Sequence, residues 1–286
     1  MESVRWAFNF KNWKPKKQDW ALALSLIQAE EKERINRFVF KKDAKASLVG
    51  RLMIRKFVSS KLEIPWSNII LSRSEKGRPY LENSLQAPFT NVDFNVAHQG
   101  DWVVLAAELG PNVGVDVMKV EKASNKDTSE FFRLMRRQFT SEEWIDIKSP
   151  IDEDGQLSVF YRHWCLKEAL VKSIGIGIGF DLQRISFETL TKELKMNEIT
   201  TDTKVRIDNE LMNEWYFEET LVDDSHPIAV GLKWNDSFVK DAYIDKPREK
   251  FQHLSFDDLI SEAEGLHPVD EISAEAFVNK KETPWE

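Results

Sequence analysis

A carboxylate and an ammonium group recur along one apolar segment, residues 164–172 (Trp-Cys-Leu-Lys-Glu-Ala-Leu-Val-Lys). Trp164, Glu168 and Lys172 are spaced four apart, so they lie one above another on the same face of a helix. The residues between them are mostly apolar, which predicts a helix that is buried on more than one side. An unpaired buried charge is costly. Glu168 and Lys172 therefore either form a plain i,i+4 ion pair or bind charged groups outside the helix.

Asp116 interrupts a β-branched run, Val113-Gly114-Val115-Asp116-Val117. Acids are poor strand formers and are rarely buried without a partner. Asp116 either faces a turn at the end of this strand or meets Glu168 in the fold. In the second case the two carboxylates give two hard oxygen ligands, which suits Mg²⁺, because that ion takes its other ligands from water and substrate phosphates. Lys172, one turn beyond Glu168, would then meet the same phosphates.

A third group of polar residues lies upstream. Arg73, Lys76 and Arg78 flank a turn in a predicted hairpin, and Asn95 and His98 lie at the end of a predicted strand. Cationic side chains around a loop are what a phosphate-rich small molecule requires. A lone His at a turn is more often incidental, so this group alone leaves the ligand open.

Two familiar phosphate-binding motifs are excluded. The sequence Gly-Ile-Gly-Ile-Gly at 175–179 follows a predicted helix and lacks the G-x-G-x-x-G spacing of a dinucleotide fingerprint. No Gly-rich P-loop precedes a Lys-Ser or Lys-Thr pair. Residues 175–179 instead indicate the end of a helix and a turn.

The bulk composition narrows the class of protein. The chain has 286 residues, 42% of them hydrophobic, enough for one large domain or two ordinary ones. A net charge of −8 argues against a nucleic-acid binder. The single cysteine permits neither an internal disulfide nor a Cys/His zinc pattern. No signal-peptide or membrane-spanning pattern is seen, so we expect a cytosolic protein with no membrane partner.

The periodicity of apolar residues predicts both helices and strands. Helices are predicted at residues 20–40, 44–62, 131–139 and 158–174, and Thr140 to Glu143 read as a capping box that opens another. Strand-like segments are predicted within residues 68–81, 92–109, 113–117, 205–207, 214–217 and 228–233. Because a regular β-α-β alternation is missing, an α+β fold is expected. We divide the chain into residues 1–109, residues 110–245, and an acidic, loosely packed extension at 246–286.

One segment is basic although the whole chain is acidic. Between Lys32 and Lys61 there are ten Lys or Arg residues against two acids, a local charge of about +8. This segment is either a solvated helix face or a surface for a negatively charged partner.

Three blocks, in this order, resemble the 4′-phosphopantetheinyl transferases, and in particular their pseudo-dimeric, surfactin-synthetase-activating type. They are Phe94-Asn95-x-x-His98, Gly114-Val115-Asp116-Val117 and Trp164-x-x-Lys167-Glu168-Ala169-x-x-Lys172-x-x-Gly175-x-Gly177. Upstream segments at 31–35, 43–45 and 50–56 resemble the broad-specificity cytosolic animal members of that family. The likeness runs from about Val4 to Gly231 and is less clear in the tail.

The resemblance implies two similar α+β subdomains related by a pseudo-twofold, each with a small, mainly antiparallel sheet and a long helix. Coenzyme A and Mg²⁺ would lie in the cleft between the two subdomains. Carried over by position, the metal ligands would be Asp116 and Glu168, and the catalytic residues would be Glu168 and Lys172. Coenzyme A contacts are implied for Arg34, Arg73, Ser74, Glu75, Lys76, Gly77, Arg78, Asn95, Val96, Ala97, His98, Glu168, Ala169, Leu170, Val171 and Lys172.

Two positions depart from the family pattern. Met118 stands where many relatives have a third acid, so water is expected to complete the metal coordination. Ala97 stands where a Ser usually precedes the motif His, which removes one hydroxyl near coenzyme A and is expected to cost about 1 kcal/mol of affinity.

The implied activity is transfer of 4′-phosphopantetheine from coenzyme A to a serine of apo acyl or peptidyl carrier domains, with release of adenosine 3′,5′-bisphosphate. Carrier domains of fatty-acid synthase and aminoadipate-semialdehyde dehydrogenase are the expected partners. A monomer is expected because one chain supplies both subdomains. The competing hypothesis is a catalytically silent protein that binds coenzyme A or docks carriers without transfer.

Overall fold

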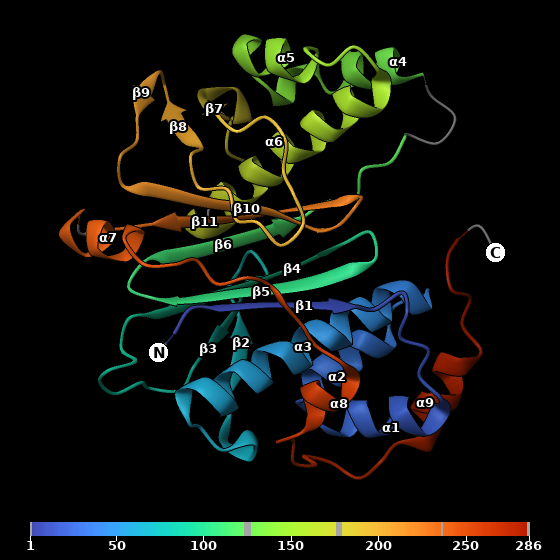
Figure 1. Ribbon diagram of the computed structural model, residues 1–286. Helices are drawn as coiled ribbons and strands as arrows, with labels where there is room; N and C mark the ends of the chain where they lie inside the picture. Colours follow the sequence, from blue (N-terminus) through green and yellow to red (C-terminus); the bar gives the residue numbers. More distant parts are fainter. Residues whose placement is uncertain (1, 123–126, 176–178, 236, 285–286) are drawn as a thin grey trace.

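The computed structural model describes residues 2–122, 127–175, 179–235 and 237–284. In Figure 1 the strands form the middle of the molecule, with helices of the first half on one side and helices of the second half on the other. Within these described ranges, no helix is both long and apolar enough to cross a membrane.

The first half is a three-stranded antiparallel unit covered by helices. Its elements are β1 (Val4–Asn9), α1 (Lys17–Ser25), α2 (Ala29–Asn36), α3 (Lys41–Leu62), β2 (Leu71–Arg73), β3 (Pro79–Leu81), β4 (Val92–Gln99) and β5 (Trp102–Leu109), with a 3-10 helix η1 (Trp66–Asn68) after α3. The predicted hairpin at 92–109 is confirmed. The predicted helix at 20–40 is wrong as one element, since residues 26–28 separate α1 from α2.

The second half begins directly after β5. Its elements are β6 (Asn112–Val117), α4 (Thr128–Leu134), α5 (Ser141–Ile147), α6 (Glu153–Ile174), β7 (Ile185–Glu188), β8 (Lys204–Ile207), β9 (Glu210–Leu211), β10 (Trp215–Asp223), β11 (His226–Lys233) and α7 (Ser237–Ile244), with 3-10 helices η2 (Arg136–Gln138) and η3 (Leu182–Arg184). The capping box at Thr140 is confirmed, and Gly175 ends α6 with a positive φ of 65°. The key helix starts at Glu153, five residues before the predicted start.

The two halves repeat one topology. In the first half β1 pairs with β5, which pairs with β4; in the second half β6 pairs with β11, which pairs with β10, all antiparallel. Each half places a 22-residue helix, α3 or α6, between its first strand and its later hairpins. The expected α+β fold with two similar subdomains is therefore confirmed.

The halves meet where β4 lies alongside β6. Asp93 Oδ2 accepts a hydrogen bond from the N–H of Val113 at 2.7 Å. Two residues further along β4, Asn95 Oδ1 accepts one from the N–H of Val115 at 3.1 Å. Side chains of β4 thus satisfy backbone donors of β6 that would otherwise be buried without partners. This seam fixes Asp116 relative to β4.

Helix α6 approaches β6 unusually closely, and two glycines allow it. Gly114 and Gly231 face each other across the β6–β11 pair. A Cβ added at Gly114 would lie 1.9 Å from the carbonyl oxygen of Ala169 on α6, and one added at Gly231 would lie 3.4 Å from that oxygen. The strands β6 and β11 beneath α6 must therefore have no side chain at these two positions.

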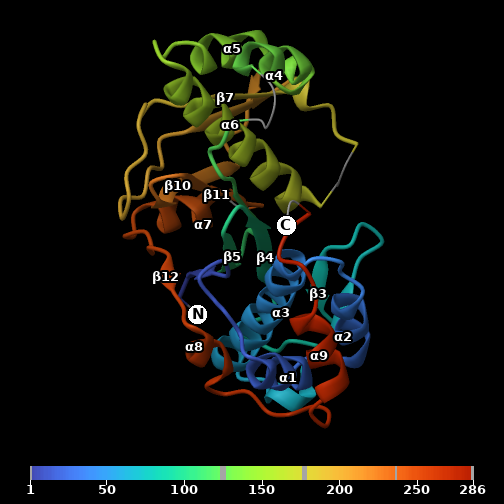
Figure 2. The same ribbon diagram turned by 90° about the vertical axis from the view of Figure 1, so that its right-hand side faces the viewer.

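The C-terminal extension is tightly packed, so the expectation of a loose tail is wrong. It contains β12 (Gln252–His253), α8 (Phe256–Ile260) and α9 (Glu271–Val278), and β12 pairs in parallel with β1. Figure 2 shows α8 and α9 beside α1 and α3. The Phe277 ring stacks on Trp20 with a centroid distance of 3.6 Å, and Leu259 is fully buried. The tail completes the core of the first half because a few apolar residues among its acids face inward.

We expect Gly114→Ala to lower the free energy of unfolding by about 3 kcal/mol, since the added methyl group collides with helix backbone that cannot give way locally. The transfer activity that the resemblance implies should fall with it, because α6 must move away from β6. Chemical denaturation of the purified variant measures the stability change.

The matched control is Gly265→Ala, because nothing lies within 4 Å of a Cβ added there. Its stability should stay within about 0.5 kcal/mol of the wild type. Equal stability of the two variants would show that the close approach of α6 to β6 imposes no constraint.

Candidate active site

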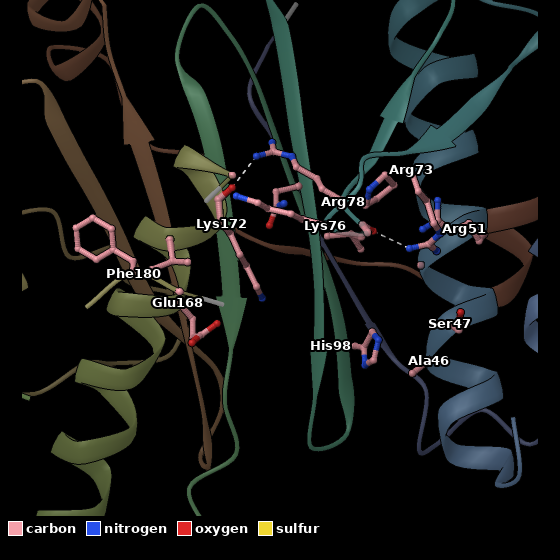
Figure 3. Close-up of a pocket in the computed structure, with 18 of the residues that line it drawn as sticks. Ala46, Ser47, Arg51, Arg73, Lys76, Arg78, His98, Glu168, Lys172 and Phe180 are labelled. Atoms are coloured by element: carbon pink, nitrogen blue, oxygen red, sulfur yellow. Dashed lines mark hydrogen bonds between the residues drawn. The ribbon is translucent and has the colours of Figure 1, made fainter. Parts of the chain in front are cut away.

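A cleft of about 650 Å³ opens between the two halves. One wall comes from α2, α3, the β2–β3 turn and β4, and the other comes from α6 and the segment after it. Figure 3 shows Glu168, Lys172 and Phe180 on the α6 side and Ser47, Arg51 and Arg73 on the opposite side. The cleft therefore draws on residues more than a hundred positions apart.

Asp116 and Lys172 meet beside this cleft. The Lys172 Nζ donates to Asp116 Oδ1 at 2.6 Å, which joins α6 to β6. Asp116 is 5% exposed, and its Oδ2 has no hydrogen-bond partner among the residues that the structure describes. Burial raises the pKa of Asp116, and the Lys172 ammonium opposes that rise only in part. The simple i,i+4 pair is not formed in the described structure, because Lys172 pairs with Asp116 and not with Glu168.

Glu168 lines the cleft one turn before Lys172. Burial raises the pKa of Glu168, and the nearby negative charge of Asp116 raises it further. The two carboxylates therefore lie close enough to repel each other, as expected if Asp116 and Glu168 converge. A carboxylate with a raised pKa is a better proton acceptor than an ordinary one.

These residues fit a divalent cation with an incomplete protein shell. The unpartnered Oδ2 of Asp116 is a buried acceptor without a donor, and a cation beside it would relieve the repulsion with Glu168. Among the described residues, no group of three or more His, Cys, Asp or Glu side chains is arranged to hold a metal ion. Two protein ligands, with the rest from substrate and water, is the pattern of Mg²⁺ at phosphate sites.

Three arginines gather on the opposite wall around one carboxylate. Glu31 of α2 binds Arg34 and Arg73 at 2.8 Å each and lies 3.5 Å from Arg51 of α3. Arg34 and Arg73 were predicted from the sequence, whereas Arg51 was not assigned to the site. We call these three residues the arginine cluster.

Arg51 gives the cluster an unsatisfied cation. It is 4% exposed and lines the cleft, and within the described part of the chain its terminal nitrogen NH1 has no hydrogen-bond partner. Its pKa is lowered to about 9, chiefly by burial; Glu31 opposes this shift, and the charges of Arg73 and Arg34 add to it. An anion in the cleft would accept a hydrogen bond from NH1 and would stabilise the buried positive charge of Arg51. The spacing of Ser47, Gly50 and Arg51 on one face of α3 was the signal that could have identified this wall.

Arg78 is already occupied by the protein. Its guanidinium donates to the carbonyl of Lys172 at 2.6 Å, to Asp93 at 2.8 Å and to the carbonyl of Val113 at 3.0 Å. These bonds use the terminal nitrogens NH1 and NH2, and the predicted coenzyme A contact of Arg78 stays a prediction. Arg78 instead ties the β2–β3 hairpin to the end of α6.

The structure brings together most of the residues predicted to contact coenzyme A. Those that line the cleft are Arg34, Arg73, Lys76, Gly77, Arg78, Asn95, Val96, His98, Glu168, Val171 and Lys172. Ser74 and Glu75 lie in the β2–β3 turn but do not line it. The side chains of Ala97, Ala169 and Leu170 are buried in apolar clusters, and their contacts with coenzyme A stay a prediction.

His98 projects into the cleft from the end of β4, opposite α3 (Figure 3). The surrounding cleft walls desolvate its ring and lower its pKa, and the charges of Lys172, Arg34 and Lys42 add to this effect, with Asp43 opposing it. The imidazole of His98 is therefore uncharged at neutral pH and acts as a hydrogen-bonding group.

An apolar end of the cleft was not predicted. Trp164 and Val171 of α6, together with Phe180 and Leu182, line it. Trp164 was noted for its helical spacing and as the start of a motif block but was not assigned to the site, and nothing in the sequence placed Phe180 beside it. Gly177 of the sequence motif lies outside the described residues.

Comparison with known families follows the two halves of the fold. Residues 11–110 match the family described as 4′-phosphopantetheinyl transferase, N-terminal. Residues 112–231 match the 4′-phosphopantetheinyl transferase superfamily. The boundary between the two matches falls in the β5–β6 turn.

Individual relatives agree. The chain is 44% identical over 289 residues to the L-aminoadipate-semialdehyde dehydrogenase-phosphopantetheinyl transferase of Homo sapiens, covering 99% of this chain and 94% of that protein. The protein of the same name from Xenopus laevis is 42% identical, covering 100% and 95%. The 4′-phosphopantetheinyl transferase Sfp of Bacillus subtilis is 29% identical, covering 57% and 66%. With both halves matched and a cleft built from the motif residues, the chain belongs to the 4′-phosphopantetheinyl transferase superfamily.

Proposed function

We propose that this transferase takes 4′-phosphopantetheine from coenzyme A, attaches it to a serine of an apo carrier domain and releases adenosine 3′,5′-bisphosphate. The observation that carries the proposal is the two-sided cleft. Asp116, Glu168 and Lys172 converge on one wall, and the arginine cluster lies on the other. A ligand that carries a diphosphate and a further phosphate group would place one of these groups beside the cations of each wall.

The chemistry is an in-line displacement at phosphorus. The serine oxygen forms a bond to the β-phosphorus of coenzyme A, and the bond from that phosphorus to the bridging oxygen breaks. Glu168 takes the serine proton, and its raised pKa favours that role. Lys172 leaves Asp116 and neutralises the departing phosphate.

Asp116 and Glu168 would hold Mg²⁺, and the unpartnered Oδ2 of Asp116 supports this assignment. When bound, the ion supplies neutralisation of the charge that develops on the diphosphate. Without it, the two carboxylates would repel the diphosphate that the arginine cluster attracts.

Carrier domains are the acceptors, and we propose that those of aminoadipate-semialdehyde dehydrogenase and fatty-acid synthase are among them. The names of the animal relatives support the first. The basic segment between Lys32 and Lys61 is the proposed docking surface, because carrier domains of this class are acidic. We also propose a monomer, since one chain supplies both cleft walls. A cytosolic location stays a prediction from the sequence.

The alternative of a catalytically silent binding protein is not supported. Such a protein could keep the arginine cluster but would have no need for Asp116, Glu168 and Lys172 beside it. All three are present and meet in the structure.

The central experiment is incubation of the purified protein with coenzyme A, Mg²⁺ and an apo carrier domain, followed by intact-mass spectrometry. The carrier should gain the mass of one 4′-phosphopantetheine group. An unchanged carrier mass with several different carrier domains would contradict the proposed transfer.

Asp116→Asn and Glu168→Gln keep side-chain shape but remove the charges. We expect each to lower kcat by about 10²–10⁴-fold, because the metal ligands and the proton acceptor are lost. Raising the Mg²⁺ concentration should partly restore Asp116→Asn. Glu188→Gln, at an exposed end of β7, is the matched control and should keep full activity. Near-normal rates in both cleft variants would remove the metal hypothesis.

Lys172→Ala should lower kcat by roughly 10²–10³-fold while the KM for coenzyme A changes little, because the ammonium acts on charge that develops in the transition state. Steady-state kinetics separates the two parameters. Lys195→Ala removes an exposed lysine of the same half and serves as the control. The reverse pattern, a large rise in KM with kcat intact, would make Lys172 a ground-state binding residue.

A further inference from the structure

An acid stands at the centre of the cationic wall of the cleft. Glu31 is 6% exposed and contacts all three members of the arginine cluster. One carboxylate against three guanidinium groups leaves a formal charge of +2. A negative charge beside an anion-binding wall would normally weaken anion binding, so its presence calls for a physical reason.

The contacts show what Glu31 does to the guanidinium groups. In each of the three pairs, the Nε nitrogen of the arginine lies closest to the carboxylate, at 2.8 Å for Arg34, 2.8 Å for Arg73 and 3.5 Å for Arg51. Each guanidinium therefore turns its Nε edge to Glu31, and Arg73 makes a second bond to it through NH2 at 3.2 Å. Arginine carries its remaining donors on the terminal nitrogens.

Further contacts fix two of those guanidinium planes. Arg34 NH2 donates to Ser47 Oγ, and Arg73 NH1 donates to the carbonyl of Gly77 at 2.8 Å. Arg51 NH1 has no partner, and all three arginines line the cleft. The carboxylate thus orients the three guanidinium groups, and it leaves the terminal nitrogen NH1 of Arg51 available to donate to a ligand.

Glu31 also reduces the electrostatic repulsion among the three arginines of the cluster. Three guanidinium groups repel one another at these distances, and Arg51 has lost most of its contact with water. Burial alone would raise the pKa of Glu31, but its contacts with Arg73, Arg51 and Arg34 lower the pKa overall, so the carboxylate is ionised at neutral pH. Without that charge the arginines would spread apart and lose their common orientation.

We propose that Glu31 is a positioning residue that preorganises Arg34, Arg51 and Arg73 for the phosphate groups of the co-substrate. The inference rests on the proposed use of coenzyme A by this cleft. Removing a negative charge from the anion-binding wall should then weaken anion binding. Simple electrostatics, without positioning, gives the opposite result.

The test is Glu31→Gln, which keeps the size of the side chain but removes its charge. The KM and the calorimetric Kd for coenzyme A should rise by about tenfold or more, which corresponds to the loss of charge-assisted hydrogen bonds. The kcat at saturating coenzyme A and the KM for the carrier domain should stay within about twofold, because Glu31 touches no reacting atom.

Glu33→Gln is the matched control. It makes the same charge change on the same helix, but Glu33 is largely exposed, and its ion pair in the described structure is with Arg37 at 3.7 Å. Its coenzyme A affinity should equal that of the wild type. Glu31→Asp keeps the charge on a shorter side chain and should give an intermediate KM.

The outcomes separate the two proposals. If the wild type transfers phosphopantetheine and Glu31→Gln binds coenzyme A as tightly as the wild type or more tightly, the positioning role is wrong. If the wild type neither binds coenzyme A nor modifies carriers, the proposed function fails first. Should Glu31→Gln not fold, Glu31→Asp decides the question, since an unchanged KM for coenzyme A in that variant would equally overturn the inference.

Discussion

The close packing of α6 on β6 is the constraint on which the site depends. Gly114 lets the backbone of α6 come within contact distance of the strand, and two residues later Asp116 lies 2.6 Å from Lys172. A side chain at position 114 would separate the carboxylate from both charged groups of the helix. The catalytic wall is therefore a consequence of backbone packing, and Arg78 holds the same contact from the other half by binding the carbonyl at the end of α6.

The two halves share a topology but carry different chemistry. Their long helices, α3 and α6, both face the cleft, yet α3 presents Ser47 and Arg51 where α6 presents Glu168 and Lys172. A pseudo-twofold fold needs matched strands and helices but no matched surface residues. One half could therefore specialise in holding phosphate groups, and the other in moving a proton and stabilising charge.

Local signals in the sequence predicted local structure well. The capping box at Thr140, the stop at Gly175 and the β4–β5 hairpin all depend on residues close in the chain. The meeting of Asp116 with Glu168 came from resemblance, because no periodicity links them. The tail was misjudged since its acidic composition concealed Leu259 and Phe277, whose partners lie more than two hundred residues away. Arg51 was missed because the helical pattern of α3 does not show which of its faces lines the cleft.

The basic segment shows how a linear charge count misleads. Of its ten cations, Lys45, Arg51 and Arg55 are almost fully buried. Lys45 pairs with Glu282 of the tail, and Arg55 donates to the carbonyls of Trp66 and Ile69. Lys45 and Arg55 thus hold the first half together, Arg51 lines the cleft, and none of the three can face a docked carrier domain. The positive charge that stays on the surface is smaller than the sequence suggests. This part of the surface borders the cleft at Arg34. On the proposed function, a carrier domain docked there would bring its serine to the mouth of the cleft, and the remaining positive charge would serve docking and co-substrate binding at adjacent places.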